Sequence, residues 1–84
     1  MNIVIYTKPL CKFCIDSKNL LDDLNLNYNQ IVLYPNEHNY TVKRDNLFEK
    51  YNHKSFPIII IDDKFIGGYT ELKRYTDFIT TDDF

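Results

Sequence analysis

The stretch from Pro57 to Ile66, PIIIIDDKFI, restricts the possible folds more than any other part of the sequence. Four consecutive isoleucines predict a strand, because β-branched side chains fit a pleated sheet. Asp62-Asp63 predicts a tight hairpin turn into a second strand over residues 64–66. Two strands joined by so short a turn pair antiparallel. The fold must therefore include an antiparallel pair.

The other segments alternate between strand and helix patterns. Residues 2–6 and 29–34 are rich in β-branched residues and predict two further strands. Apolar residues recur at helical spacing after Cys14, and Asn25 is expected to end that helix as a left-handed cap. Two more helices are predicted by the apolar stripes Leu47, Phe48, Tyr51 and Leu72, Tyr75, Ile79.

The predicted order is strand, helix, strand, helix, strand, strand, helix. A strand–helix–strand start implies a parallel pair, so the sheet is expected to be mixed, with helices packed against it. The 84 residues contain no repeat, low-complexity segment or linker. We therefore expect residues 1–84 to form one small α/β domain with a single core.

Charge and hydropathy argue against several function classes. Ten basic residues against twelve acidic ones give no electrostatic reason to expect nucleic-acid binding. Asp82 and Asp83 are interpreted as a solvated acidic tip. The first residues lack the features of a signal peptide, and no apolar run approaches the ~20 residues of a membrane span. A reducing cytoplasm is the expected setting.

The chain has two cysteines, and they lie three residues apart in KPLCKFC. A structural disulfide between Cys11 and Cys14 would close almost no loop in the unfolded chain. The pair makes only half of a tetrahedral zinc site, and His38 and His53 lack the paired spacing that would complete it. Chance proximity is a further reading. A reactive dithiol, which exchanges electrons with a disulfide, explains the spacing best.

The two thiols are predicted to have different roles. They lie at a helix start, where unpaired amide groups and the helix dipole favour a thiolate. Cys11 is nearer the loop and is flanked by Lys8 and Lys12, so the pKa of its thiol is expected well below its ordinary value. Cys14 falls on the buried stripe of the helix. We therefore predict that Cys11 attacks a substrate disulfide and Cys14 resolves the product.

Three segments in this order, YTKPLCKFC, SFPIIIID and IGGYTEL, resemble the signature segments of the glutaredoxins. These are small thioredoxin-fold oxidoreductases that use glutathione. The resemblance extends over residues 2–79. It implies a thioredoxin-like fold, with a four-stranded mixed sheet flanked by three helices. It also implies a cis peptide bond before Pro57, packed beside the cysteine pair.

The resemblance further implies seven glutathione-binding residues. One group would meet the glycyl end of the tripeptide, a second would pair with its cysteinyl backbone as an added strand does, and a third would hold the γ-glutamyl carboxylate. Helix N-termini attract carboxylates, which supports the third group. The three groups are, in that order, Lys8 and Lys54; Phe56 and Pro57; Tyr69 and Thr70. The seventh residue, Phe13, would lie beside the bound tripeptide.

Two positions depart from the family's pattern. Lys12 follows the first cysteine, where the family commonly has proline, and this changes the local charge. Ser55-Phe56 precedes the expected cis proline, where the family usually has threonine and valine. A phenylalanine there is expected to add bulk to the rim of the groove and to alter substrate preference.

The resemblance implies a dithiol glutaredoxin that reduces protein disulfides and glutathione mixed disulfides. Glutathione would be the co-substrate, no metal is expected, and the chain is expected to be a monomer. Family members also reduce ribonucleotide reductase, which makes that enzyme a candidate partner.

Two alternatives remain open. Because Lys12 replaces proline, the chain could carry a [2Fe-2S] cluster between two subunits, held by Cys11 and glutathione. A thioredoxin-like protein reduced directly by a reductase has less support, since the chain has no tryptophan.

Overall fold

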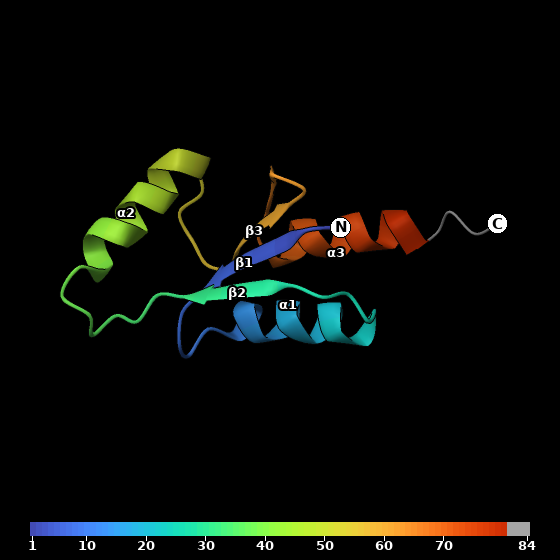
Figure 1. Ribbon diagram of the computed structural model, residues 1–84, viewed down its shortest axis with the longest axis horizontal. Coiled ribbons are helices and arrows are strands. Elements are labelled where there is room, and N and C mark those ends of the chain that lie inside the picture. The colour runs from blue at the N-terminus through green and yellow to red at the C-terminus, as the bar shows by residue number, and fades with distance from the viewer. Residues whose placement is uncertain (81–84) are drawn as a thin grey trace.

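A computed structural model describes residues 1–80 (Figure 1). Asp82 and Asp83, predicted to form an acidic tip, lie outside the described residues. The predicted order of strands and helices is confirmed. The elements are β1 (Ile3–Thr7), α1 (Lys12–Asp23), β2 (Asn29–Val32), α2 (Tyr40–Tyr51), β3 (Ile58–Ile61), β4 (Lys64–Gly67) and α3 (Tyr69–Thr80).

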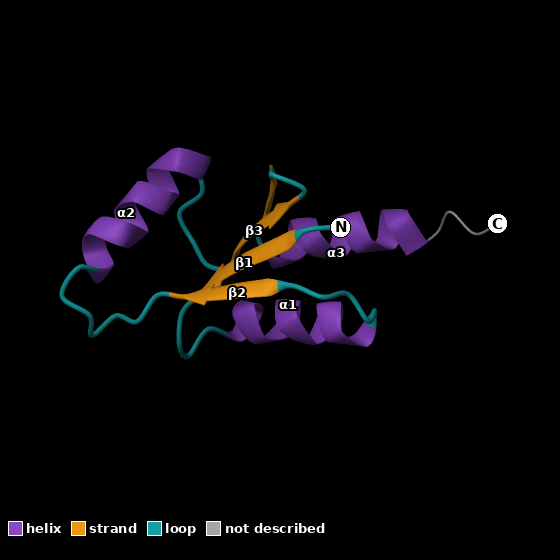
Figure 2. Cartoon of the chain, in the orientation of Figure 1, coloured by secondary structure: helices purple, strands orange, loops and turns teal. Residues whose placement is uncertain are grey.

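The four strands form one mixed sheet in the order β2-β1-β3-β4 (Figure 2). β1 pairs parallel to β2 and antiparallel to β3, and β3 pairs antiparallel to β4. The crossover helix α1 permits the parallel pair, and the tight turn after β3 enforces the antiparallel one. The expected thioredoxin-like architecture, a mixed sheet with three helices, is confirmed.

One face of the sheet carries the main core. Ile3 and Ile5 of β1 lie opposite Ile61 and Ile59 of β3, and all four are almost fully buried. Leu21 of α1 and Leu72 of α3 join the same cluster, because α1 and α3 pack against each other over this face. Fully burying a side chain of this size contributes about 1.5–3 kcal/mol. These contacts fix the position at which α1, and with it the cysteine pair, begins.

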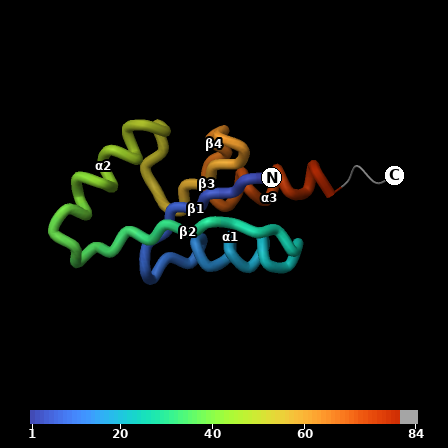
Figure 3. Tube along the Cα trace, viewed as in Figure 1, coloured from blue at the N-terminus to red at the C-terminus, as the bar shows by residue number. Residues whose placement is uncertain are grey.

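Helix α2 is held more loosely. In Figures 1 and 3 it lies at one end of the sheet, away from α1 and α3, and none of its residues is buried. Its partly buried side chains pack on a second cluster that contains both cysteines together with Leu33 and Phe56. Those α2 side chains are Tyr40, Leu47 and Phe48. The attachment of α2 and the setting of the cysteines therefore share one apolar cluster.

Two turns follow from local chemistry as predicted. Asp62 and Asp63 both have positive φ angles, 50° and 66°, the left-handed pair that a two-residue hairpin requires. Asn25 also has a positive φ, 56°, after the end of α1. Its N–H donates to the carbonyl of Asp22 at 3.0 Å, and the next N–H, of Leu26, donates to Leu21 at 2.9 Å. Asn25 thus closes α1 in place of glycine.

Strand β2 ends earlier than predicted, at Val32 rather than at residue 34. The next residue, Leu33, still donates its N–H to the carbonyl of Thr7 at 2.8 Å, but its side chain turns into the cluster beneath α2. This edge strand is largely exposed, so little packing extends it.

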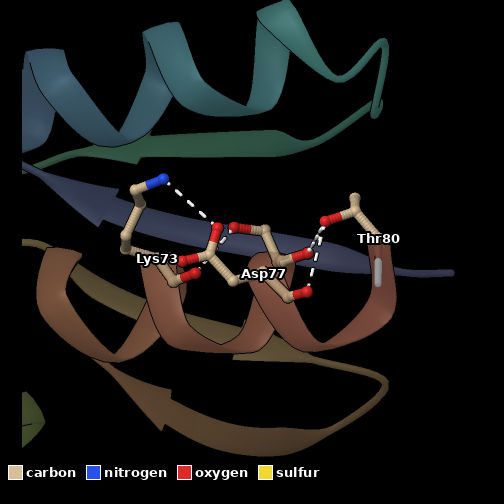
Figure 4. A network of polar contacts seen from close by, with 4 residues as sticks. Lys73, Asp77 and Thr80 are labelled. Carbon is tan, nitrogen blue, oxygen red and sulfur yellow. Dashed lines mark hydrogen bonds and ion pairs between the residues drawn. The ribbon is translucent and has the colours of Figure 1, made fainter. Parts of the chain in front are cut away.

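Polar contacts occupy the later turns of α3 (Figure 4). Lys73 Nζ lies 3.2 Å from Asp77 Oδ1, an exposed i,i+4 ion pair. The Thr80 hydroxyl donates to the Thr76 carbonyl at 2.8 Å. These contacts satisfy the C-terminal part of the helix, which lies away from the cysteines. Among residues 1–80 no helix is long and apolar enough to cross a bilayer.

Candidate redox site

The pairing of β1 with β3 assembles the site. Tyr6 lies opposite Ile58, so the loop that follows β1 meets the segment that precedes β3. That loop leads into Cys11, and that segment contains Phe56 and Pro57. The Cys11 Sγ consequently lies 3.9 Å from the Phe56 carbonyl oxygen, across 45 residues of sequence.

Cys11 and Cys14 are joined as a disulfide, with their Cα atoms 5.2 Å apart. Cys11 is the N-cap of α1, and its sulfur accepts the backbone N–H of Cys14 at 3.2 Å. Both residues are buried, with Cys11 8% exposed and Cys14 2% exposed. The structure thus agrees with a helix-start position and with the greater burial of Cys14. Such a pair can take up or release two electrons as it interconverts between disulfide and dithiol.

The two lysines beside Cys11 are not equivalent. Lys12 Nζ forms an i,i+4 ion pair with Asp16 Oδ2 at 2.8 Å, and the hydrogen bond to this carboxylate raises the pKa of Lys12. The charge of Lys12 is therefore neutralised locally, on the outside of the first turns of α1. Lys8 is exposed in the loop before Cys11. Of the two flanking charges, only that of Lys8 forms no ion pair with an acidic side chain within residues 1–80.

The segment before β3 adopts the conformation that the resemblance implies. The Phe56–Pro57 peptide bond is cis, which confirms that expectation. The Phe56 side chain is only 8% exposed, and its ring lies 5.4 Å from that of Phe48 in α2. We expected this ring to add bulk to the rim of the groove. Most of it instead fills the cluster under α2.

A groove of about 190 Å³ lies between the segment before β3 and the start of α3. It brings together five of the seven residues predicted to bind glutathione, while Lys8 and Lys54 are not among its lining residues. Lys54 is exposed and lines a separate hollow beside α2. The five residues that do line the groove are Phe13, Phe56, Pro57, Tyr69 and Thr70.

Aromatic rings and a helix start form the walls of this groove. Phe13 of α1 stacks on Tyr69 of α3, with ring centroids 6.0 Å apart and planes 19° apart. Glu71 accepts the N–H of Gly68 at 2.8 Å, half of a capping box at the start of α3. Gly67 has a φ of +132°, and a Cβ there would meet the Glu71 side chain at 2.6–2.9 Å. Glycine at 67 therefore lets the chain enter α3 with its carboxylate cap in place.

Sequence reasoning missed four residues of the groove: His53, Ser55, Gly68 and Glu71. Glu71 could have been found, because an acidic residue three positions after a helix cap is a capping pattern. Ser55 adjoins the predicted Phe56. Nothing in the local sequence distinguishes His53 from a surface histidine. His38, weighed with it as a zinc ligand, is exposed in the loop before α2. No group of three or more metal-ligating side chains occurs within residues 1–80.

Comparisons with known proteins agree on one family. Residues 3–66 match the glutaredoxin family model. The chain is 33% identical over 72 residues to the mitochondrial glutaredoxin-2 of Bos taurus, which covers 86% of this chain and 45% of that protein. It is 30% identical over 71 residues to glutaredoxin 3 of Escherichia coli strain K12, covering 84% of this chain and 81% of that protein.

A solved structure supports the same conclusion about the fold. The crystal structure of a buckwheat glutaredoxin–glutathione complex matches with a TM-score of 0.78 and 26% identity, covering 89% of this chain and 68% of that one. The chain spans less than half the length of the mammalian mitochondrial relatives that it matches.

Proposed function

The chain belongs to the glutaredoxin family, and from that premise we propose that it is a glutathione-dependent thiol–disulfide oxidoreductase. The observation that carries the proposal is the Cys11–Cys14 disulfide at the start of α1, beside a groove that begins at the cis Phe56–Pro57 bond. A structural cross-link of this spacing would stabilise the fold little, so reactivity is the better reason for the pair.

The proposed reaction is a series of thiol–disulfide exchanges. The Cys11 thiolate attacks a glutathionylated protein, forms a Cys11–glutathione mixed disulfide and releases the protein thiol. A second glutathione thiolate then attacks this mixed disulfide, so that glutathione disulfide leaves and Cys11 is regenerated. With a protein disulfide, Cys14 attacks the mixed disulfide instead and releases the reduced protein. Two glutathiones then reduce the Cys11–Cys14 disulfide.

Burial and hydrogen bonding support the assignment of Cys11 as the attacking sulfur. Cys11 accepts the Cys14 N–H at the N-terminus of α1, and this donor would stabilise a thiolate. Cys14 is 2% exposed, so an external disulfide would reach it less readily. Once a substrate is bound to Cys11, Cys14 is the thiol within bonding distance.

The groove is proposed to hold the glutathione moiety. The backbone of Phe56 would pair with the cysteinyl part of the tripeptide, and the first amide groups of α3, at Tyr69 and Thr70, would face the γ-glutamyl carboxylate. Phe13 would cover one side. Lys8 and Lys54 lie outside the groove lining, so they would act as screened charges from its surroundings. The matched buckwheat glutaredoxin is described as a glutathione complex, which supports this ligand class.

The partners and setting are proposed in the same way. Disulfide-bearing proteins, with ribonucleotide reductase as a candidate, would be the substrates of a cytoplasmic monomer. No resident metal is part of the proposal, and no group of three or more histidine, cysteine or carboxylate side chains that could hold one occurs in residues 1–80.

Two parallel assays test the proposal. The first assay contains a glutathionylated peptide, glutathione, glutathione reductase and NADPH, without thioredoxin or its reductase. The second assay contains a protein disulfide, thioredoxin reductase and NADPH, without glutathione. We expect NADPH consumption in the first assay and none above background in the second. Activity only with thioredoxin reductase would overturn glutathione dependence. A brown protein after anaerobic purification would instead favour a cluster carrier.

A further inference from the structure

Among the described residues that line the groove, His53 is the only one whose side chain can carry positive charge. The other groove residues are aromatic, small or hydroxyl-bearing, apart from the carboxylate of Glu71. Glutathione brings two carboxylates. A groove whose fixed side-chain charge is negative would repel them, so the state of His53 decides the electrostatic balance of the groove.

The position of His53 follows from its contacts. Its ring packs edge-on against Phe65 of β4, with centroids 5.5 Å apart. Its Nε2 lies 3.4 Å from the point where Gly68 would carry a Cβ, and Glu71 Oε1 lies 3.6 Å from the same point. The missing side chain of Gly68 therefore leaves a gap that His53 and Glu71 face from opposite elements. Within residues 1–80 His53 forms no ion pair with an acidic side chain across this gap.

Ser55 couples the charge of His53 to a second donor. Its Oγ lies 3.3 Å from His53 Nε2. When Nε2 is unprotonated it accepts the hydroxyl proton of Ser55, and that hydroxyl is then occupied. When the imidazole is protonated, Nε2–H donates to Oγ instead, and the Ser55 hydroxyl is free to donate to a ligand in the groove. Protonation at Nε2 of the Nδ1–H tautomer thus adds a positive charge and releases one hydrogen-bond donor.

We propose that His53, together with Ser55, forms the carboxylate-recognising part of this groove and makes its affinity for glutathionylated substrates fall as pH rises through the neutral range. The inference rests on the proposed function, since it concerns how the same groove holds the glutathione moiety. Histidine is the side chain whose charge ordinarily changes within this range.

The groups that face His53 do not change the expected direction of the pH effect, which is a lower affinity at higher pH. Glu71 approaches from α3, Phe65 from β4 and Ser55 from the same loop, and the exposed Lys54 adjoins it in sequence. Glu71 is already occupied by the N–H of Gly68. Neither Phe65 nor Ser55 carries a charge at neutral pH. The groove therefore gains positive charge as pH falls.

The test measures KM and kcat for a glutathionylated peptide at pH 6.0 and pH 8.0. In the parent protein we expect KM to rise about two- to fivefold between these values, the effect of one screened charge pair. His53→Gln should show the higher KM at both pH values, and His53→Lys, which keeps the charge, the lower KM at both. Ser55→Ala should weaken the pH dependence without abolishing it. His38→Gln, a change of the other histidine of the chain, should behave like the parent.

A second substrate separates charge recognition from effects on the thiols. The same peptide joined to cysteamine through a disulfide offers no carboxylate on the moiety that the groove would hold. Its KM should not respond to His53→Gln, and kcat should change little for either substrate. If the His53 variants match the parent with the glutathionylated peptide, the inference is wrong while the proposed function stands. If the parent does not turn over that peptide at all, the proposed function fails and the inference with it.

Discussion

Reversing the charge of Lys8 tests why Cys11 is the attacking thiol. In the reduced protein the Cys11 thiolate would keep the N–H of Cys14, now 3.2 Å from its sulfur. A hydrogen bond to a charged acceptor contributes about 1.5–3 kcal/mol, and the N-terminus of a helix adds about 0.3–1 kcal/mol. Burial opposes ionisation, because Cys11 is only 8% exposed. We expect the two backbone contributions to prevail and to hold the pKa of the Cys11 thiol below that of free cysteine.

Lys8 supplies the smaller, adjustable part of this stabilisation. It is exposed, so its charge should favour the thiolate by about 0.2–1 kcal/mol. Lys8→Glu removes that attraction and adds a repulsion of similar size, roughly 0.4–2 kcal/mol in all. The pKa of the Cys11 thiol should rise in the variant. It should nevertheless stay below that of free cysteine, because the backbone donors remain.

The assay follows the rate of iodoacetamide alkylation against pH in a Cys14→Ser background, where only Cys11 can react. Lys64→Glu is the matched control, since it changes net charge equally. Lys64 pairs with Ile61, and Ile61 pairs with Ile3 at the far end of β1 from Cys11. If Lys8→Glu and Lys64→Glu both titrate like the parent, Lys8 has no part in the mechanism. If the parent itself titrates like free cysteine, burial outweighs the helix terminus and the reasoning is refuted.

Three further predictions address the thiols, the groove and the core. Cys11→Ser should abolish activity, while Cys14→Ser should still reduce glutathione mixed disulfides, because a second glutathione replaces the resolving thiol; the opposite result would exchange their roles. Lys54→Ala should raise KM for a glutathionylated substrate about two- to fivefold without changing the thiol pKa. Thr70→Pro should raise this KM more than Thr70→Val does, because proline also removes a backbone N–H at the start of α3. Equal KM values for the parent and for the Lys54 and Thr70 variants would exclude Lys54 and Thr70 from binding. Leu72→Ala, at a fully buried site, should lower the free energy of unfolding by about 2–5 kcal/mol in urea titrations, whereas Val42→Ala, at a site 62% exposed, should stay within about 0.5 kcal/mol.

The parts of the fold that were predictable depend on neighbouring residues in the sequence. The turn at Asp62-Asp63 and the cap at Asn25 adopt left-handed backbone angles that short polar side chains tolerate. The isoleucine run forms β3 with all four side chains buried. In each case the deciding interactions lie within a few residues, so the pattern alone was sufficient.

The parts of the site that were not predictable depend on tertiary contacts. His53 reaches the groove because Phe65 of β4 supports its ring and Gly68 leaves space beside it. Lys12 looked like a charge beside Cys11, but Asp16, one helical turn later, takes that charge, a local i,i+4 contact that helical spacing makes predictable. The position of His53, by contrast, depends on which partner lies nearest in space. Neither the spacing of the histidines nor the resemblance to glutaredoxins contains that information.

Phe56 explains how a departure from the family's pattern can leave the groove intact. Its carbonyl oxygen lies 3.9 Å from the Cys11 sulfur, so its backbone belongs to the redox site. Its ring, by contrast, packs on Phe48 in the cluster that holds α2, a helix with no buried residue of its own. The ring at position 56 is therefore one of the contacts that hold α2. Only the small exposed part of the ring contributes to the wall that a substrate would meet.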